Sequence, residues 1–197
     1  MVPRIVFNPE FLTERSAFFD FINQSRIILG GEPENVKKVA NLYHDRFGNH
    51  LPIIKTNYET AELIKYMNNC FFATKVSFLN DMKIIADSVG ANWTEAVEGF
   101  ILDGRIGHSH INVPGHDGKK GFGGSCFPKD LNGIIAFAKA LRLDNDPHFN
   151  PFKESSNHGR KLLATNTLEG AWKTNLKVRP EKDWEELKGR SIVDGDE

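Results

Sequence analysis

The stretch TNYETAELIKYMNNCFFATKVSFLNDMKIIADSVG at residues 56–90 decides the fold, because no Gly or Pro interrupts it before Gly90. Thr56 followed by Glu59 is a capping-box pattern, and apolar residues recur behind it with helical spacing. The stretch predicts one helix of about 32 residues, which at 1.5 Å per residue is about 48 Å long. A domain of this size cannot bury such a length, so the helix is expected to contact another subunit or domain.

Shorter elements are predicted on both sides of this helix. Strands or extended segments are expected at 4–7, 25–29 and 52–55. Helices are expected at 13–23, 33–47 and 93–103, and from Pro128 onward. After Leu143 the pattern weakens to one helical stretch near 162–172, and 150–197 is interpreted as an appendage. The predicted fold class is mainly α (α+β), with one long helix and a few short N-terminal strands.

The composition excludes several classes of protein. The 197 residues carry 25 basic and 26 acidic side chains without a dense basic block, which argues against nucleic acid or an anionic membrane as the main partner. No apolar run approaches a membrane span, and the charged N-terminal residues do not resemble a signal peptide. Two cysteines make no disulfide framework or metal spacing. A cytoplasmic protein is expected.

The segment GFGGSCFPKD at residues 121–130 contains the best candidate for a nucleophile. Pro128 suits the first position of the following helix, which places Cys126 just outside it. A helix N-terminus and a nearby cation such as Lys129 both favour a thiolate, and the glycines would let backbone amides approach a ligand. The alternative is a small buried side chain, because free cysteine is among the most buried residue types. The residues alone leave both interpretations open.

Three further groups of polar residues are candidates, each with a structural alternative. Lys65 and Asn69 share one helix face and could hold an oxyanion, or simply be solvated. Glu10 and Glu14 follow a predicted strand and could act as a base, or only complement a helix N-terminus. Arg105 is a candidate phosphate ligand in a loop that also contains His108, His110 and His116. A metal site is not expected there, because no acidic or thiol ligand has a zinc-like spacing.

Four motifs together resemble one family, the UDP-glucose/GDP-mannose dehydrogenases, and most closely its members that oxidise UDP-glucose. They are NPEFLTE at 8–14, AELIKYMNNCFFATKVSFLND at 61–81, DGRIG at 103–107 and GFGGSCFPKD at 121–130. Their order and spacing also agree, and the resemblance spans roughly residues 4–147.

The resemblance implies a two-step oxidation of the C6 alcohol of UDP-glucose to the carboxylate of UDP-glucuronate, using two NAD⁺. Cys126 would attack the C6 aldehyde to give a thiohemiacetal, which a second oxidation turns into a thioester that water cleaves. Lys65 and Asn69 would stabilise the oxyanion. Asp130, with Lys65, would hold the reactive water, and Glu10 would act as acid and base in hydrolysis.

The resemblance also implies binding residues and an oligomeric state. Residues expected to bind the UDP-sugar are Phe11, Leu12, Arg105, Phe122, Gly123 and Gly124, with Arg105 reaching the substrate of a neighbouring subunit. The backbone amides of 121–125 would face that ligand. Glu14 and Lys129 would lie near the cofactor. The long helix would form a homodimer.

The family's dinucleotide fingerprint does not occur in this sequence. Residues 1–31 are therefore interpreted as the edge of an NAD-binding domain, 32–147 as the helical central domain and 148–197 as a C-terminal extension. A truncated or split enzyme is expected, with weak or no NAD binding and activity alone, and a separate NAD-binding chain is a possible partner. The alternatives are a related dehydrogenase acting on GDP-mannose or a UDP-aminosugar, and a non-catalytic module that binds sugar nucleotides or dimerises.

Overall fold

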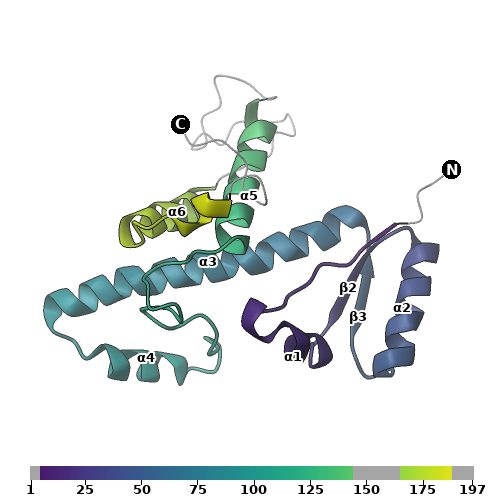
Figure 1. Ribbon diagram of the computed structural model, residues 1–197, viewed down its shortest axis with the longest axis horizontal. Helices are drawn as coiled ribbons and strands as arrows, with labels where there is room; N and C mark the ends of the chain where they lie inside the picture. The colour runs from purple at the N-terminus through teal and green to yellow at the C-terminus, as the bar shows by residue number, and fades with distance from the viewer. Residues whose placement is uncertain (1–4, 144–164, 188–197) are drawn as a thin grey trace, which may run out of the picture. The chain divides into compact units, whose positions relative to one another are not determined.

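The computed structural model describes residues 5–143 and 165–187, which fold as two compact units (Figure 1). The division falls within the longest helix, so that residues 1–68 form the first unit and 69–197 the second. Helices predominate and a single small sheet accompanies them, which confirms the predicted mainly α (α+β) class. Among the described helices, none has both the length and the apolar character needed to cross a membrane.

The first unit contains a three-stranded sheet in the order β1-β2-β3. β1 (Val6–Phe7) pairs antiparallel with β2 (Ile27–Gly31), and β2 pairs parallel with β3 (Ile53–Thr56). Parallel neighbours need a crossover connection, which α2 (Pro33–Phe47) supplies. A cluster of buried side chains between α2 and the sheet forms the core of this unit: Ile27, Leu29, Val36, Ala40 and Leu51.

The predicted helix at 13–23 is shorter and less regular than expected. It consists of the 3-10 helix η1 (Glu14–Ser16) followed by α1 (Ala17–Ile22). The Asp20 carboxylate accepts hydrogen bonds from the Thr13 N–H at 2.8 Å and the Ser16 hydroxyl at 2.9 Å. These bonds lower the pKa of Asp20 and tie the preceding loop to α1.

The long helix α3 extends over Tyr58–Val89, close to the predicted bounds. Its predicted cap is wrong by one position, because Thr56 pairs in β3 and Asn57 accepts the Thr60 N–H at 2.9 Å instead. Asn is as good a cap as Thr, and the strand leaves Thr56 no freedom to turn. The helix ends at Gly90, whose φ of 72° suits glycine.

The second unit packs three further helices around the rest of α3. α4 (Trp93–Ile101) begins at Asn92, whose side chain accepts the N–H groups of Thr94 and Glu95 as predicted. α5 (Cys126–Leu143) and α6 (Asn166–Val178) contact each other. Their core consists of Cys70 and Ala73 from α3, Phe122, Leu131 and Ile135 from the loop and α5, and Ala171 from α6.

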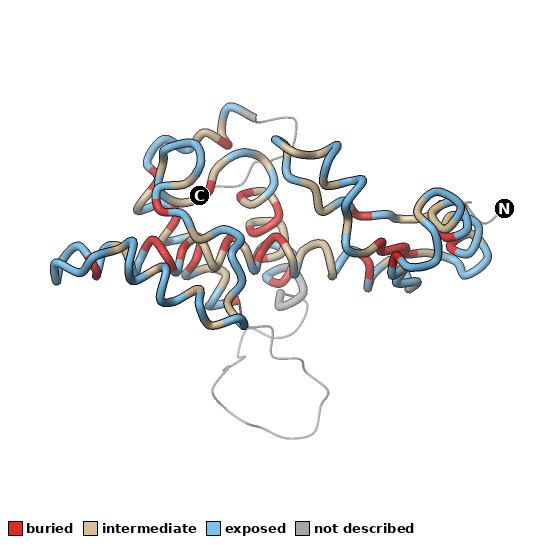
Figure 2. Tube along the Cα trace, turned by 90° about the horizontal axis from the view of Figure 1, so that it is seen from below, coloured by how far each residue is buried: buried red, intermediate tan, exposed pale blue. Residues whose placement is uncertain are grey.

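Residues 165–187 pack as part of this unit, although the sequence suggested an appendage. Ala171, Asn175, Arg179 and Trp184 are all buried. Figure 2 colours the described part of the chain by burial. α6 continues to Val178 and is followed by the 3-10 helix η2 (Asp183–Leu187). The weak apolar periodicity failed as a guide because polar side chains make many of the contacts. The proposed boundary at residues 147–148 and the first part of the predicted helix at 162–172 lie outside the described residues.

Candidate active site

Cys126 is exposed and is the first residue of α5, rather than lying just before the helix. The helix starts early because the Lys129 N–H already bonds to the Ser125 carbonyl at 3.3 Å. Pro128 is tolerated at the third helical position, because N–H groups of the first turn have no partner within the helix. The Ser125 hydroxyl lies 3.7 Å from the thiol. The thiol therefore lies at an accessible helix N-terminus, as the nucleophile hypothesis requires.

Cys70, the other cysteine, is in the opposite situation. It is 6% exposed in the core of the second unit. Burial and the negative charge of Asp130 raise the pKa of its thiol to about 12. Since a thiol reacts as the thiolate, Cys70 is inert at neutral pH. Cys126 is the accessible one of the two cysteines in the sequence.

Asp130 lies one turn after Cys126 on the same helix and is almost completely buried. One of its carboxylate oxygens accepts a hydrogen bond from Asn69 Nδ2 at 2.5 Å, and the other pairs with Lys129 Nζ at 2.5 Å. Residues four apart share a helix face, so Cys126 and Asp130 lie on the same side of α5. The structure thus brings Asn69, Lys129 and Asp130 together near the start of the nucleophile's helix.

Lys65 and Glu10 form a second polar group, within the first unit. Lys65 Nζ lies 3.0 Å from Glu10 Oε1 and donates to the Glu10 carbonyl at 2.5 Å. The other Glu10 oxygen accepts the Leu12 N–H at 2.7 Å. The Phe11 ring lies 4.3 Å from the Arg26 guanidinium and 5.5 Å from Lys65 Nζ. The NPEFLTE loop is therefore folded around Lys65, while the Glu14 side chain lies outside the described residues.

The first glycines of the GFGG loop make room for side chains of the chain itself. The Gly121 N–H bonds to Asn80 Oδ1 at 3.1 Å, and the Phe122 N–H bonds to Asn175 Oδ1 at 2.7 Å. The prediction that all amides of 121–125 face a ligand is therefore wrong for these two. Phe122 is 4% exposed and packs in the core. Substrate binding by Phe122, Gly123 and Gly124 stays a prediction.

Arg105 lies at the surface of the loop after α4. Its guanidinium pairs with the Asp103 carboxylate at 2.5 Å, and its side chain is 88% exposed. The loop is held by Lys75 of α3, whose Nζ donates to the carbonyls of Ile106, Gly107 and Ser109 at 2.8–3.1 Å. Burial lowers the pKa of Lys75. Lys75 was not among the predicted site residues. The only sign of its role in the sequence is that a lysine stands within an apolar helical run.

The histidines of this loop do not gather around a common point. His110 stacks on Phe72 with ring centroids 4.1 Å apart, and burial, Lys75 and His116 lower its pKa. His116 lies 3.5 Å from the Asn112 amide. Among residues 5–143 and 165–187, no three His, Cys, Asp or Glu side chains are arranged to hold a metal ion.

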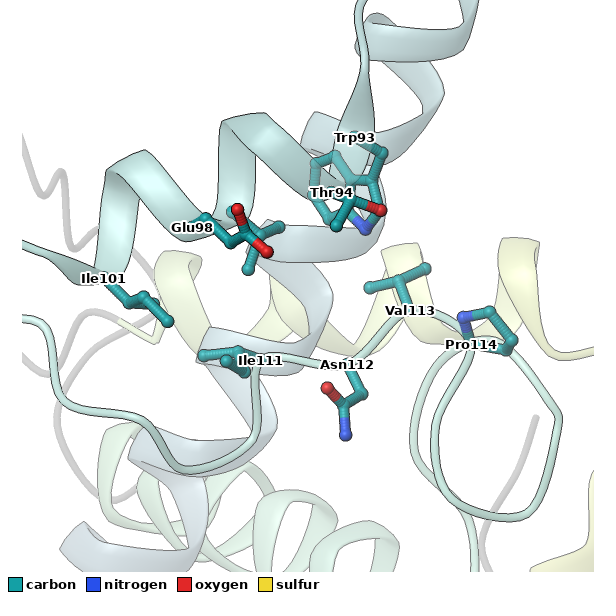
Figure 3. A pocket seen from close by; sticks show the side chains of 9 residues that line it. Trp93, Thr94, Glu98, Ile101, Ile111, Asn112, Val113 and Pro114 are labelled. Carbon is teal, nitrogen blue, oxygen red and sulfur yellow. The ribbon is translucent and has the colours of Figure 1, made fainter.

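A groove of about 310 Å³ lies between α4 and the loop at 111–114 (Figure 3). Six of its nine lining residues are apolar, and Thr94, Glu98 and Asn112 contribute polar groups. None of the residues predicted to form the site lines this groove. It is therefore separate from the proposed chemistry at Cys126.

The described residues show no dinucleotide-binding loop. The glycine pair that ends β2, Gly30 and Gly31, is not a phosphate loop, because both residues pair with β1 and Gly30 also pairs with β3. A Cβ at Gly30 would lie 2.5 Å from the Ala61 Cβ, so this glycine allows close packing against α3. Lys129, expected near the cofactor, is paired with Asp130.

Known proteins match the same part of the chain. The model of the "UDP-glucose/GDP-mannose dehydrogenase family, central domain" matches residues 59–152. UDP-glucose 6-dehydrogenase TuaD of Bacillus subtilis is 43% identical over 136 residues, which are 69% of this chain and 28% of TuaD. UDP-glucose 6-dehydrogenase AglM of Haloferax volcanii is 40% identical over 140 residues, covering 69% of this chain and 31% of AglM.

A solved structure agrees with these relatives. The UDP-glucose dehydrogenase from the archaeon Pyrobaculum islandicum has a TM-score of 0.67 and 29% identity, covering 87% of this chain and 34% of the other. The chain thus spans about a third or less of the length of the relatives that it matches. Residues 59–152 thus match the central domain of the UDP-glucose/GDP-mannose dehydrogenase family.

Proposed function

We propose that this chain supplies the nucleophile of an NAD-dependent UDP-glucose 6-dehydrogenase, which forms UDP-glucuronate. The observation that carries the proposal is the contrast between the two thiols. Cys126 is exposed at the start of an 18-residue helix, whereas Cys70 is buried with a pKa raised to about 12. The relatives named UDP-glucose 6-dehydrogenase support the substrate.

Cys126 acts twice in the proposed chemistry. Its thiolate adds to the carbonyl carbon of the C6 aldehyde, and the oxygen takes a proton to give the thiohemiacetal. After oxidation to the thioester, water adds to the same carbon and the thiolate leaves, releasing the carboxylate. NAD, the acceptor that the resemblance implies, supplies the two oxidations. Because the described residues show no dinucleotide-binding loop, we assign roles only to the chain's own side chains.

The polar residues on α3 and α5 are given complementary roles. Lys65 and Asn69 donate hydrogen bonds to the oxyanion that forms when the carbonyl is attacked. Asp130 holds the hydrolytic water, and Glu10 moves the proton during hydrolysis. The contacts of Lys65 with Glu10 and of Asn69 with Asp130 support this pairing of donor and acceptor groups. The remaining proposed roles concern binding. The residues proposed to bind the UDP-sugar are Phe11, Leu12, Arg105, Phe122, Gly123 and Gly124, and those proposed to lie near the cofactor are Glu14 and Lys129.

We further propose a cytoplasmic homodimer formed through α3. Large apolar side chains on one face of this helix are exposed by 40–72%: Leu63, Met67, Phe71, Phe78, Met82, Ile85 and Val89. They are separated by three, four or seven residues, which places them on one helical stripe. A continuous apolar stripe of this kind is typical of an interface.

Selective thiol labelling tests the proposed function. Iodoacetamide at neutral pH should label Cys126 at least about tenfold faster than Cys70, because only Cys126 is accessible. Saturating UDP-glucose should slow the labelling of Cys126, and mass spectrometry of the peptides measures both rates. Cys126→Ser is the control for the assignment. Equally slow labelling of both thiols without protection would indicate a non-catalytic module, and protection by GDP-mannose alone would indicate a different sugar nucleotide.

A further inference from the structure

The loop that leads to Cys126 is held by side chains of α6. Asn175 accepts the Phe122 N–H at 2.7 Å and donates to the Phe122 carbonyl at 2.9 Å. Both polar groups of its amide are thus used on one peptide segment, and the residue is 0% exposed. A buried amide with matched partners specifies a single backbone arrangement, because any other leaves polar groups unpaired.

Asn80 of α3 holds the preceding residue. Its Oδ1 accepts the Gly121 N–H at 3.1 Å, and its Nδ2 donates to the Val76 carbonyl at 2.8 Å. Gly121 has φ 69°, and a Cβ there would lie 2.3 Å from Asn175 Oδ1. The glycine is therefore needed for the close approach of α6 as well as for its backbone conformation.

Arg179 makes a third contact, one turn after Asn175. It is 2% exposed, donates to the Lys120 carbonyl at 3.3 Å, and pairs with Asp117 and Asp183 at 2.6 Å each. A Cβ at Gly123 would lie 2.4 Å from its Nη2. Residues 120–123 are thus enclosed by Asn80, Asn175 and Arg179.

We propose that Asn175 is a positioning residue for Cys126, acting with Asn80 through the backbone of Gly121 and Phe122. The loop enters α5 three residues after Gly123, so its path sets the direction of the first N–H groups of α5 beside the thiol. The contacts of this loop with Asn175 and Arg179 keep that path in place. The inference rests on the proposed role of Cys126, but its test does not require substrate.

The test compares Asn175→Ala with Thr174→Ala in the whole chain. Thr174 is the adjacent residue of α6 and bonds to Asp81 at 3.1 Å, so its removal costs α6 a side-chain hydrogen bond without touching the loop. Asn175→Ala should speed hydrogen exchange of a peptide covering 119–125 about tenfold or more. Iodoacetamide labelling of Cys126 should slow about threefold to tenfold as the helix N-terminus loses its order. Thr174→Ala should change neither rate by more than about twofold.

Cys70 reports whether the variant is still folded. It packs in the core with Ala171 of α6, so it stays unreactive only while α6 remains in place. If Cys70 of Asn175→Ala labels as fast as Cys126, Asn175 stabilises the core rather than the loop, and the proposal is wrong. Unchanged exchange and labelling at residues 119–126 would overturn it equally. If UDP-glucose does not slow the labelling of Cys126 in the unaltered chain, that result counts against the proposed function but not against the role of Asn175.

A second variant approaches the same contact from the loop. Gly121→Ala forces the loop away from Asn175 Oδ1 while leaving Asn175 intact, and it should give the same faster exchange and slower labelling. Because both changes disrupt one contact, the double variant should be no slower in labelling than the worse single variant, within about twofold. If the factors by which the two changes slow labelling multiply in the double variant, the two residues act independently, which would contradict the proposal.

Discussion

Two faces of α3 differ sharply within the second unit. The face toward α5 and α6 is buried, at Asn69, Cys70, Ala73, Ser77 and Asn80. Another face of the same helix exposes large apolar side chains, at Phe71, Phe78, Met82, Ile85 and Val89. The buried face thus carries several polar side chains, whereas these exposed side chains are apolar.

Hydrogen bonds explain how the polar face comes to be buried. Asn69 bonds to Asp130, Ser77 to the Ala171 carbonyl at 2.8 Å, and Asn80 to the Gly121 N–H. Buried polar groups need partners at fixed positions, so this face specifies which elements cover it and in what register. An apolar face requires only removal from water. In the proposed function, the polar face of α3 carries the site and the apolar face carries the dimer contact.

The largest predicted effect concerns Asn69. Asn69→Ala leaves the buried Asp130 carboxylate without one of its donors, which should lower the free energy of unfolding by about 2 to 3 kcal/mol. Its neighbour Asn68 is the matched control, because its longer bond to Arg26, 3.5 Å, should make Asn68→Ala cost less than about 0.5 kcal/mol. Urea unfolding followed by tryptophan fluorescence measures the difference, since all three tryptophans lie in the second unit. Equal losses in both variants would contradict a special role for the buried face.

The sequence predicted the length of α3 and its need for a contact outside a small domain, but not the hydrogen bonds of its buried face. An uninterrupted run without Gly or Pro predicted α3 almost to its ends, and its length alone indicated a partner outside a small domain. The position of Cys126 beside a helix start could also be predicted, because GFGGSCFPKD combines a thiol, glycines and a helix-start proline in ten residues, but the sequence left open whether this thiol is exposed or buried.

The contacts that hold the nucleophile's loop could not be predicted from the sequence. Asn175 bonds to a residue 53 positions away, and Asn80 to one 41 positions away. No local spacing reports such pairs, and an isolated asparagine in a helix is usually a solvated residue. For this reason the weak apolar periodicity after Leu143 suggested an appendage. In the structure, the side-chain amide of Asn175 and the guanidinium group of Arg179 join this segment to the second unit.

The exposed face gives the next largest effect. Ile85→Glu should raise the dissociation constant of the proposed dimer at least about tenfold, because a carboxylate would have to be buried at the interface. Ile84→Glu makes the same change one residue earlier, about 100° around the helix, and should alter the dissociation constant less. Sedimentation velocity over a range of concentrations measures both. If Ile84→Glu weakens association more than Ile85→Glu, the interface lies on a different side of α3.

The smallest effect is a pH dependence on the buried face. Burial, reinforced by the Asp130 charge, raises the pKa of Cys70 from 9.0 to about 12, so the folded state favours the neutral thiol. The unfolded chain releases this proton first; stabilisation is complete below pH 9 and is lost as the pH rises toward 12. Between pH 8 and 10, the melting temperature followed by tryptophan fluorescence should therefore fall more steeply in the unaltered chain than in Cys70→Ala. Identical slopes in the two proteins would mean that the Cys70 thiol is accessible to water, and that this face of α3 is not closed by α5 and α6.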